Sequence, residues 1–249
     1  MAEMIYGRNP VLEALRAGQP VKKLLLAEGA RARGTLAGII ALAEAKGVPL
    51  QWVERRELDR ITSHHQGVVA QVGAYRYATV EEILALARER REKPLLMVLD
   101  CLQDVHNFGS LLRTAEAVGA HGVIIPQRRA VGVTAAVRKA SAGAVEHLRV
   151  ARVPNLARTM EHLKGKGVWI IGLDTAGPQA YDEVDLNTPL ALVVGSEGKG
   201  LRRLVRETCD QLIRLPMRGR VSSLNAAVAG SIVLYEVWRQ RTKGDSRPT

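Results

Sequence analysis

Three stretches in the second half of the sequence combine polar side chains with glycine or serine where apolar segments end. They are Asn107-Phe-Gly-Ser-Leu-Leu-Arg113, Val194-Gly-Ser-Glu-Gly-Lys-Gly-Leu201 and Leu215-Pro-Met-Arg-Gly-Arg-Val-Ser-Ser-Leu-Asn225. Each stretch follows a run typical of a strand and precedes a run typical of a helix. In an open α/β sheet, ligands bind where strand ends lead into helix N-termini. We therefore expect the three loops to converge on one pocket.

These stretches resemble the three motifs of the SpoU (TrmH-like) family of RNA 2'-O-ribose methyltransferases. Residues 5–15 (IYGRNPVLEAL) and 65–70 (HQGVVA) are similar to the branch that methylates a guanosine of large-subunit ribosomal RNA. The resemblance covers nearly the whole chain. It implies S-adenosylmethionine as the cofactor, 23S ribosomal RNA as the substrate and a homodimer as the assembly.

The resemblance also implies which residues form the site. The implied cofactor-binding residues are Gly195, Gly198, Leu215, Ser223, Leu224 and Asn225. The implied catalytic residues are Asn107, Arg113, Glu197, Ser223 and Asn225. Glycines in the second loop would let the backbone approach a flat ligand closely. Each residue also has a purely structural interpretation, because leucines fill cores, glycines form turns, and asparagine, serine or glutamate at a helix start is commonly a cap.

Arg113 is the polar residue with the clearest chemical interpretation. It stands among Leu111, Leu112 and Ala115, and a charge beside apolar residues needs a partner such as RNA phosphate or ribose. Family analogy assigns this arginine as the base, but a guanidinium holds its proton far above neutral pH. We therefore interpret Arg113 as a group that grips the phosphate beside the target and polarises the 2'-hydroxyl.

Charge and composition narrow the class of protein. The 249 residues include 36 Lys+Arg against 25 Asp+Glu, a net charge of +11, which favours a polyanionic partner. Aromatic residues make up only 4%, so stacking of many bases on aromatic rings is not expected. The two cysteines and six histidines have no metal-ligand spacing, and no metal is predicted. The sequence has no signal pattern and no apolar run long enough for a bilayer, so we predict a cytoplasmic location and no membrane partner.

The chain divides into two expected domains. Residues 1–75 are expected to form a small α/β domain that binds the RNA substrate, residues 76–92 a linker with a short helix, and residues 93–249 the methyltransferase domain. In the first domain the pattern predicts helices at 11–17 and 34–46 and strands at 21–27, 50–53 and 68–72. In the second it predicts strands at 95–99, 123–125, 168–173, 190–194 and 212–215 and helices at 110–118, 134–141, 156–164, 201–207 and 224–239.

This alternation predicts an α/β fold with a parallel sheet covered by helices on both faces. The resemblance, rather than the pattern, implies a SPOUT-type domain with a C-terminal trefoil knot, and a first domain like a ribosomal RNA-binding protein. The last helix has a broad apolar side that suits either the core or a dimer interface. Two alternative functions remain open: methylation of a transfer RNA, and a non-catalytic RNA-binding role in ribosome assembly.

Overall fold

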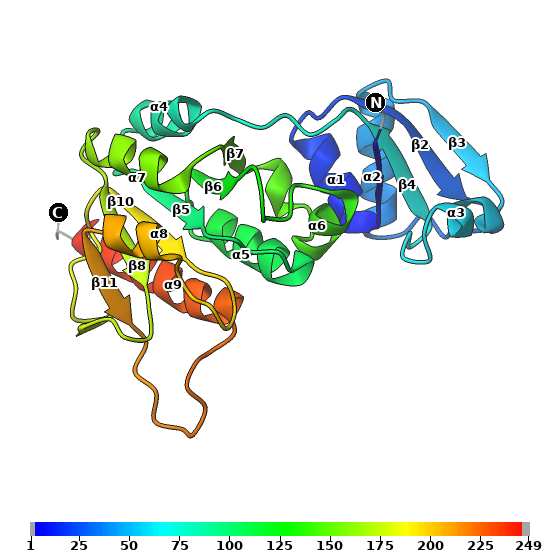
Figure 1. Ribbon diagram of the computed structural model, residues 1–249. Helices are drawn as coiled ribbons and strands as arrows, with labels where there is room; N and C mark the ends of the chain where they lie inside the picture. Colours follow the sequence, from blue (N-terminus) through cyan, green and yellow to red (C-terminus); the bar gives the residue numbers. More distant parts are fainter. Residues whose placement is uncertain (1–2, 246–249) are drawn as a thin grey trace. The chain divides into compact units, whose positions relative to one another are not determined.

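The computed structural model describes residues 3–245, which form two compact units (Figure 1). The first unit contains the chain up to Arg76 together with the segment Val133–His147. The second contains Tyr77–Gly132 and the chain from Leu148 onward. The segment 133–147 therefore leaves the second unit in the middle of its sequence and folds with the first.

A four-stranded sheet organises the first unit. Its order is β1 (Glu3–Tyr6), β4 (Val68–Val72), β2 (Val21–Ala27) and β3 (Leu50–Val53), with β4 antiparallel to both neighbours and β2 parallel to β3. Alternate residues of β2 face opposite sides. Leu24 and Leu26 share a core with α1 (Arg8–Arg16) and α2 (Thr35–Ala45), whereas Leu25 and Ala27 share one with α3 (Arg55–Ile61). The unit thus has three layers.

The segment 133–147 contains a buried ion pair, and Arg138 of that pair contacts the rest of the first unit. It contains α6 (Ala135–Ala140) and the 3-10 turn η1 (Ala144–Glu146). Arg138 Nη1 donates to Glu146 Oε1 at 2.5 Å, and the guanidinium lies 5.3 Å from the ring centre of Tyr75. Burial raises the pKa of Glu146, and the charge of Arg138 opposes that shift. A buried pair of this kind costs desolvation. The contacts of Arg138 with Tyr75 and with Glu3, at 3.5 Å, join the segment to the rest of the unit.

The second unit is built on a seven-stranded, entirely parallel sheet, as the sequence predicts. Its order is β7-β6-β5-β10-β8-β11-β9. The strands are β5 (Leu95–Leu99), β6 (Gly122–Pro126), β7 (Arg149–Val153), β8 (Trp169–Leu173), β9 (Gln179–Ala180), β10 (Leu190–Val194) and β11 (Gln211–Arg214). The strands β5 and β10 at its centre are buried along their whole length. Their carboxyl ends meet at one edge, where the loops of interest begin.

Helices cover both faces of this sheet. On one face, the side chains of α4 (Val80–Arg90), α7 (Leu156–Lys164) and α8 (Arg203–Thr208) share a core with Val98 of β5 and Val193 of β10. On the other face lie α5 (Val105–Ala117) and α9 (Ala226–Asp245). A Cβ on Gly230 of α9 would lie 2.8 Å from Leu111 of α5 and 3.1 Å from Val194, so this glycine permits their close packing.

The expected linker, residues 76–92, contains the whole of α4. Thr79 caps this helix, and the Thr79 and Glu82 side chains form a reciprocal capping box. Ile83 and Leu84 are buried in the core of the second unit. Residues 80–90 are therefore an integral layer of that unit rather than only a connection.

Several element boundaries differ from those expected from the sequence. Helix α5 begins at Val105 instead of residue 110, and α9 begins at Ala226 instead of residue 224. Helix α1 begins at Arg8 instead of residue 11. The strands β1, β7 and β9 and the helix α3 are additional to the predicted set.

Within residues 3–245, no helix is long and apolar enough to cross a membrane. In the same part of the chain, no three His, Cys, Asp or Glu side chains form a group that could hold a metal ion.

Candidate active site

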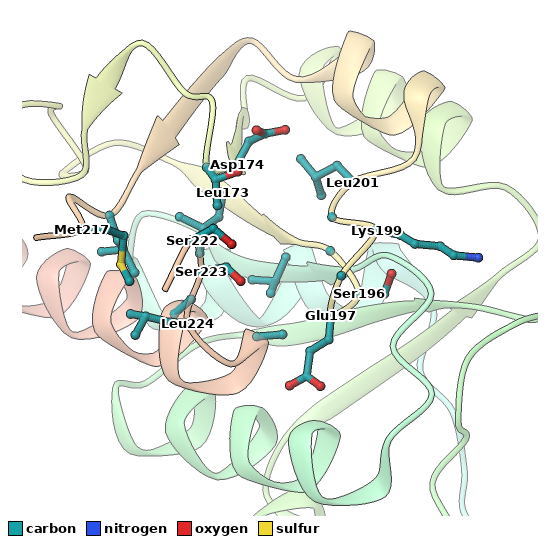
Figure 2. Close-up of a pocket in the computed structure, with 18 residues that line it drawn as sticks. Leu173, Asp174, Ser196, Glu197, Lys199, Leu201, Met217, Ser222, Ser223 and Leu224 are labelled. Carbon is teal, nitrogen blue, oxygen red and sulfur yellow. The ribbon is translucent and has the colours of Figure 1, made fainter. Parts of the chain in front are cut away.

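A cavity of about 330 Å³ lies at the carboxyl ends of the adjacent strands β10, β8 and β11 (Figure 2). Its walls come from the end of β8, from the loop after β10 and from the loop that joins β11 to α9. It is lined by Leu173, Asp174, Thr175, Val194, Gly195, Ser196, Glu197, Gly198, Lys199, Gly200, Leu201, Leu215, Met217, Ser222, Ser223, Leu224, Ala226 and Ala229. The second and third motif stretches therefore do converge on one pocket.

The loop after β10 is closed on itself by its glycines. Ser196 and Gly200 exchange two backbone hydrogen bonds, of 3.2 and 2.9 Å. A Cβ on Gly195 would lie 2.3 Å from the carbonyl carbon of Gly200, and Gly198 has a φ of +76°. The conformation of the loop itself therefore accounts for these glycines, and the close approach of backbone to ligand stays a prediction. At position 195 any side chain would collide with Gly200 on the opposite side of the loop, and at position 198 the left-handed backbone conformation favours glycine.

Asp100 anchors the far end of the same loop. This carboxylate follows β5, is fully buried, and accepts hydrogen bonds from Arg202 N at 2.8 Å and Arg202 Nε at 2.7 Å. A buried carboxylate is stable only when it is paired in this way. The pairing ties the loop after β10 to the neighbouring strand β5.

Three predicted site residues form a hydrogen-bonded group, which we call the amide–carboxylate trio. Asn107 Nδ2 donates to Glu197 Oε1 at 2.9 Å, and Asn225 Nδ2 donates to Asn107 Oδ1 at 2.8 Å. Asn225 Nδ2 also donates to Glu197 Oε1. Glu197 is not a helix cap, because α8 begins only at Arg203. Its carboxylate instead orients two amides, one from each of the other two motif stretches.

Asn107 and Asn225 lie at the N-terminal ends of α5 and α9, and backbone hydrogen bonds there fix their positions. Asn107 is a buried residue in the first turn of α5, whose N-cap is Asp104, and it is not in a loop as expected. Asn225 Oδ1 accepts from Ala227 N at 2.9 Å and Val228 N at 3.1 Å, so it caps α9. Capping and membership of the trio use different atoms of Asn225, and both interpretations of this residue are therefore compatible.

Arg113 lies apart from the cavity. It is six residues further along α5 than Asn107, about 9 Å along the helix axis, and it does not line the cavity. The side chain is exposed, whereas Leu111 and Leu112 are buried. The expectation that Arg113 is a charge set among apolar residues was therefore wrong. Among residues 3–245 no hydrogen-bond or ion-pair partner of its guanidinium is found. The chain itself leaves this charge available to a ligand.

The remaining predicted site residues line the cavity, together with residues that were not predicted from the sequence. Leu215, Ser223 and Leu224 are all on its wall, in the β11–α9 loop. The sequence analysis missed Asp174 and Met217, and Figure 2 shows both beside the cavity. The signal for Asp174 was present, because it is a polar residue directly after a strand that neighbours β10. Met217 lies in the third motif stretch, but its residue type suggested only packing.

The lining suits a small ligand with one flat apolar part and one polar part. Cavities of a few hundred Å³ that combine aliphatic walls with a few polar groups are typical of cofactor sites. Met217 and Leu224 on its wall each keep 39% of their surface exposed, which is apolar area that a ring could cover. Ser222, Ser223 and the two loop backbones supply polar groups. The residues present thus fit S-adenosylmethionine.

Sequence profiles of two known families match this chain. The profile of the SpoU rRNA Methylase family matches residues 94–235. The profile described as RNA 2'-O ribose methyltransferase substrate binding matches residues 4–78. The first match covers the sheet, α5, the first half of α9 and all three motif stretches.

Individual proteins agree with these profiles. YacO of Bacillus subtilis, whose name places it among the TrmH family tRNA/rRNA methyltransferases, is 50% identical over 96% of this chain and 96% of its own. AviRb, a SpoU methyltransferase of Streptomyces viridochromogenes crystallised with AdoMet, is 28% identical and covers 98% of this chain and 92% of its own, with a TM-score of 0.83.

An AdoMet-bound rRNA methyltransferase of Sinorhizobium meliloti is 27% identical, with a TM-score of 0.77 over 96% of this chain and 87% of its own. The profiles, the identity to YacO and the fold shared with cofactor-bound structures agree with the site described above. This chain therefore belongs to the SpoU methylase family and is an RNA methyltransferase that uses S-adenosylmethionine.

Proposed function

We propose that this protein transfers a methyl group from S-adenosylmethionine to the 2'-oxygen of a guanosine ribose in large-subunit (23S) ribosomal RNA. The observation that carries the proposal is the amide–carboxylate trio at the edge of the cavity, which brings polar groups from all three motif stretches to one place. A non-catalytic RNA-binding protein has no need of such an arrangement, so we disfavour that alternative.

We assign the cofactor to the cavity, with Gly195, Gly198, Leu215 and Leu224 along its walls. When bound, the cofactor supplies a methyl group on a positively charged sulfur. Methylation forms a bond from that carbon to the 2'-oxygen, breaks its bond to sulfur and releases the hydroxyl proton. The protein's contribution is then mainly to position the hydroxyl and to polarise it.

The polar residues receive separate roles in this proposal. Asn107 and Asn225, oriented by Glu197, hydrogen-bond the target nucleoside. Ser223 contacts the cofactor or the ribose. Arg113 grips a phosphate beside the target, in keeping with an exposed guanidinium that has no partner within residues 3–245. Only RNA offers the 2'-hydroxyl, so this chemistry selects RNA over DNA.

We assign RNA selection to residues 1–75 and methyl transfer to residues 93–249. The substrate-binding profile at residues 4–78 supports the first role. We also propose a C-terminal trefoil knot and a first domain related to ribosomal RNA-binding proteins. In support of the knot, the loop from β11 to α9 and the loop after β10 line one cavity, although β8 lies between their strands.

We further propose a cytoplasmic homodimer that pairs through α9. Helix α9 exposes a row of large apolar side chains, with Val228 48%, Tyr235 52% and Trp238 47% exposed. Val228 and Tyr235 also line an apolar hollow between α9 and α5. Leu234 of the same helix is buried within the second unit. An exposed apolar stripe of this kind is typical of a protein interface.

Transfer RNA is the second candidate substrate, because the name of YacO covers both tRNA and rRNA. The test is incubation with labelled S-adenosylmethionine and either unmodified 23S rRNA or unmodified tRNA, followed by mapping of the labelled nucleotide. We expect 2'-O-methylguanosine at one site of the rRNA. Label on tRNA alone, or on a base atom, would overturn the proposal.

A further inference from the structure

Two hollows of the second unit continue from the edge of the cofactor cavity. The first, of about 480 Å³, shares Ser196, Glu197 and Lys199 with that cavity. The second, of about 520 Å³, shares Arg129 and Arg202 with the first. Each hollow thus shares lining residues with the next, so the three are neighbours. We call the two hollows beyond the cofactor cavity the arginine groove.

The arginine groove is strongly cationic at its outer end. Arg128 and Arg129 from the segment after β6 line the second hollow together with Arg202 and Arg203 from the start of α8. No acidic side chain lines that hollow among the described residues. Arg203 is paired with Glu207, and Arg202 is paired with Asp100. Arg128 and Arg129 are both exposed, and neither has a hydrogen-bond or ion-pair partner within residues 3–245.

The backbone of Arg129 is held in an unusual conformation. Its φ is +62°, in the left-handed region that residues with a Cβ rarely adopt. Two residues earlier in the chain, the carbonyl oxygen of Gln127 accepts a hydrogen bond from Arg152 Nη2 at 3.1 Å, which helps to hold this segment. Such conformations persist where the surroundings impose them, and they concentrate at ligand-binding sites.

Most of the other residues that line the second hollow are apolar, Asn155 being the exception. Pro126, Pro154 and Leu204 line it, and Leu204 keeps 58% of its surface exposed. A cationic rim beside an apolar wall matches a nucleic acid strand, which presents phosphates on one side and flat bases and sugars on the other. A small free anion would use only the rim. Prolines and leucine take the place of aromatic rings, of which this chain has few.

We propose that the arginine groove binds the single strand of RNA adjoining the target nucleotide, with phosphates at Arg128 and Arg129 and sugars or bases against Pro126, Pro154 and Leu204. This inference rests on the proposed function, because the groove is read as the continuation of the site that holds the target. The target nucleotide occupies the first hollow beside Glu197, and its neighbour occupies the second.

The test compares RNA binding by the full chain and by two variants over a range of salt concentrations. The groove variant carries Arg128→Ala with Arg129→Gly, because glycine accepts the positive φ. The control variant carries Arg88→Ala with Arg90→Ala, which removes two exposed charges from α4 of the same unit. The RNA is an unmodified 23S rRNA transcript, and S-adenosylmethionine binding is measured for each protein as a check of the fold.

For the groove variant we expect RNA affinity to fall roughly tenfold at physiological salt, and the slope of log K against log salt to become shallower by about 1.4, which is two contacts of about 0.7 each for single strands. KM for RNA should rise while kcat and cofactor affinity stay unchanged. An unchanged slope and KM, or an equal loss in the control variant, would overturn the inference.

The outcome separates this inference from the proposed function. If wild-type protein methylates tRNA and not 23S rRNA, the proposed substrate is wrong, and the same salt series is run with that tRNA. A shallower slope for the groove variant then still supports the arginine groove. If 23S rRNA is methylated but the slope is unchanged, the proposed function stands and the groove assignment is wrong.

Discussion

The side-chain amide of Asn225 donates a hydrogen bond of 2.8 Å to the side-chain oxygen of Asn107, although the two residues are 118 positions apart in the sequence. One residue belongs to the first turn of α5 and the other caps α9. Glu197, from the loop after β10, accepts from both. The relationship joins the three motif stretches in a single polar group beside the cofactor cavity.

Two substitutions of Asn225 separate its roles. Asn225→Ala removes the α9 cap and the amide, so we expect a loss of about 1 kcal/mol in the free energy of unfolding as well as a loss of activity. Asn225→Ser keeps a capping oxygen but has no amide to donate, so stability should stay near wild type while kcat falls, roughly a hundredfold. Thermal unfolding and methyl-transfer rates measure the two effects. Full activity of Asn225→Ser would remove Asn225 from the catalytic group.

The second prediction concerns the closed loop after β10. In Gly195→Ala the added Cβ would meet the backbone of Gly200 at 2.3 Å, so the loop must move. We expect at least roughly tenfold weaker S-adenosylmethionine binding, measured by calorimetry, because the loop forms one wall of the cavity. Gly219→Ala is the matched control, since a Cβ there meets nothing within 4 Å. Equal cofactor affinity in both variants would show that this wall does not bind the cofactor.

Arg113 gives a prediction about RNA. If its guanidinium grips a phosphate with two parallel hydrogen bonds, Arg113→Lys retains the charge but loses the paired geometry, and kcat/KM should fall about tenfold. The shape of the pH–rate profile should not change. Arg158→Lys, at another exposed helical arginine of the second unit, should be neutral. A wild-type rate and a wild-type pH dependence for Arg113→Lys would exclude both the gripping and the base roles.

The proposed dimer is tested on α9. Tyr235→Arg places a charge on the exposed apolar stripe, so light scattering should find the mass of one 27.1 kDa chain where wild type has twice that mass. Trp169→Arg is the matched control, because Trp169 is equally exposed but lies at the start of β8. If Tyr235→Arg remains dimeric, or if wild type is monomeric, the assignment of α9 as the interface is wrong.

The raised pKa values of the two cysteine thiols predict how slowly these thiols react at alkaline pH. Burial raises the pKa of the Cys209 thiol to about 12, and burial together with the charge of Asp100 raises that of Cys101. At pH 8.5 we expect iodoacetamide to modify native Cys209 at least roughly a hundredfold more slowly than in unfolded protein. Peptide mapping by mass spectrometry measures both sites. Fast modification of native Cys209 would contradict its burial against β8.

The raised pKa of Cys209 also determines the direction in which stability changes with pH. The proton of Cys209 is bound more tightly in the folded chain than in the unfolded chain. Its contribution to stability is therefore complete below the ordinary thiol range and is lost as pH rises from about 9 toward 12. The free energy of unfolding of Cys209→Ser should show less of this alkaline loss than wild type does.

The sequence predicted those parts of the fold that depend on local patterns. The runs Leu95–Leu99 and Leu190–Val194 are continuous and apolar, as central parallel strands must be, and both were located correctly. Strand β7 (Arg149–Val153) was missed because it lies at the sheet edge, where Arg152 faces solvent and interrupts the apolar run. Helix α3 (Arg55–Ile61) was missed because most of its residues are charged and only Leu58 is buried, which leaves no apolar periodicity.

The sequence predicted several residues that the structure brings together, Asn107, Glu197 and Asn225, but it did not predict their geometry. Periodicity does not reveal that a carboxylate of one loop orients amides of two helices, because this depends on which strands become neighbours. The start of α5 was misplaced because Asn107 and Gly109 are poor helix formers, whereas the Asp104 cap and burial on the sheet stabilise the added turn. The environment of Arg113 was misjudged although a helix was predicted there, because the neighbours of Arg113 in sequence lie on another side of that helix: Leu111 and Leu112 are buried and Arg113 is exposed.

The most direct test is a crystal structure of the protein with S-adenosylmethionine. We predict the cofactor between the loop after β10 and the β11–α9 loop, in contact with Gly195, Leu215 and Leu224, with its methyl group facing the side where Asn107 and Glu197 meet. A cofactor bound elsewhere, or a methyl group turned away from those two residues, would contradict the account.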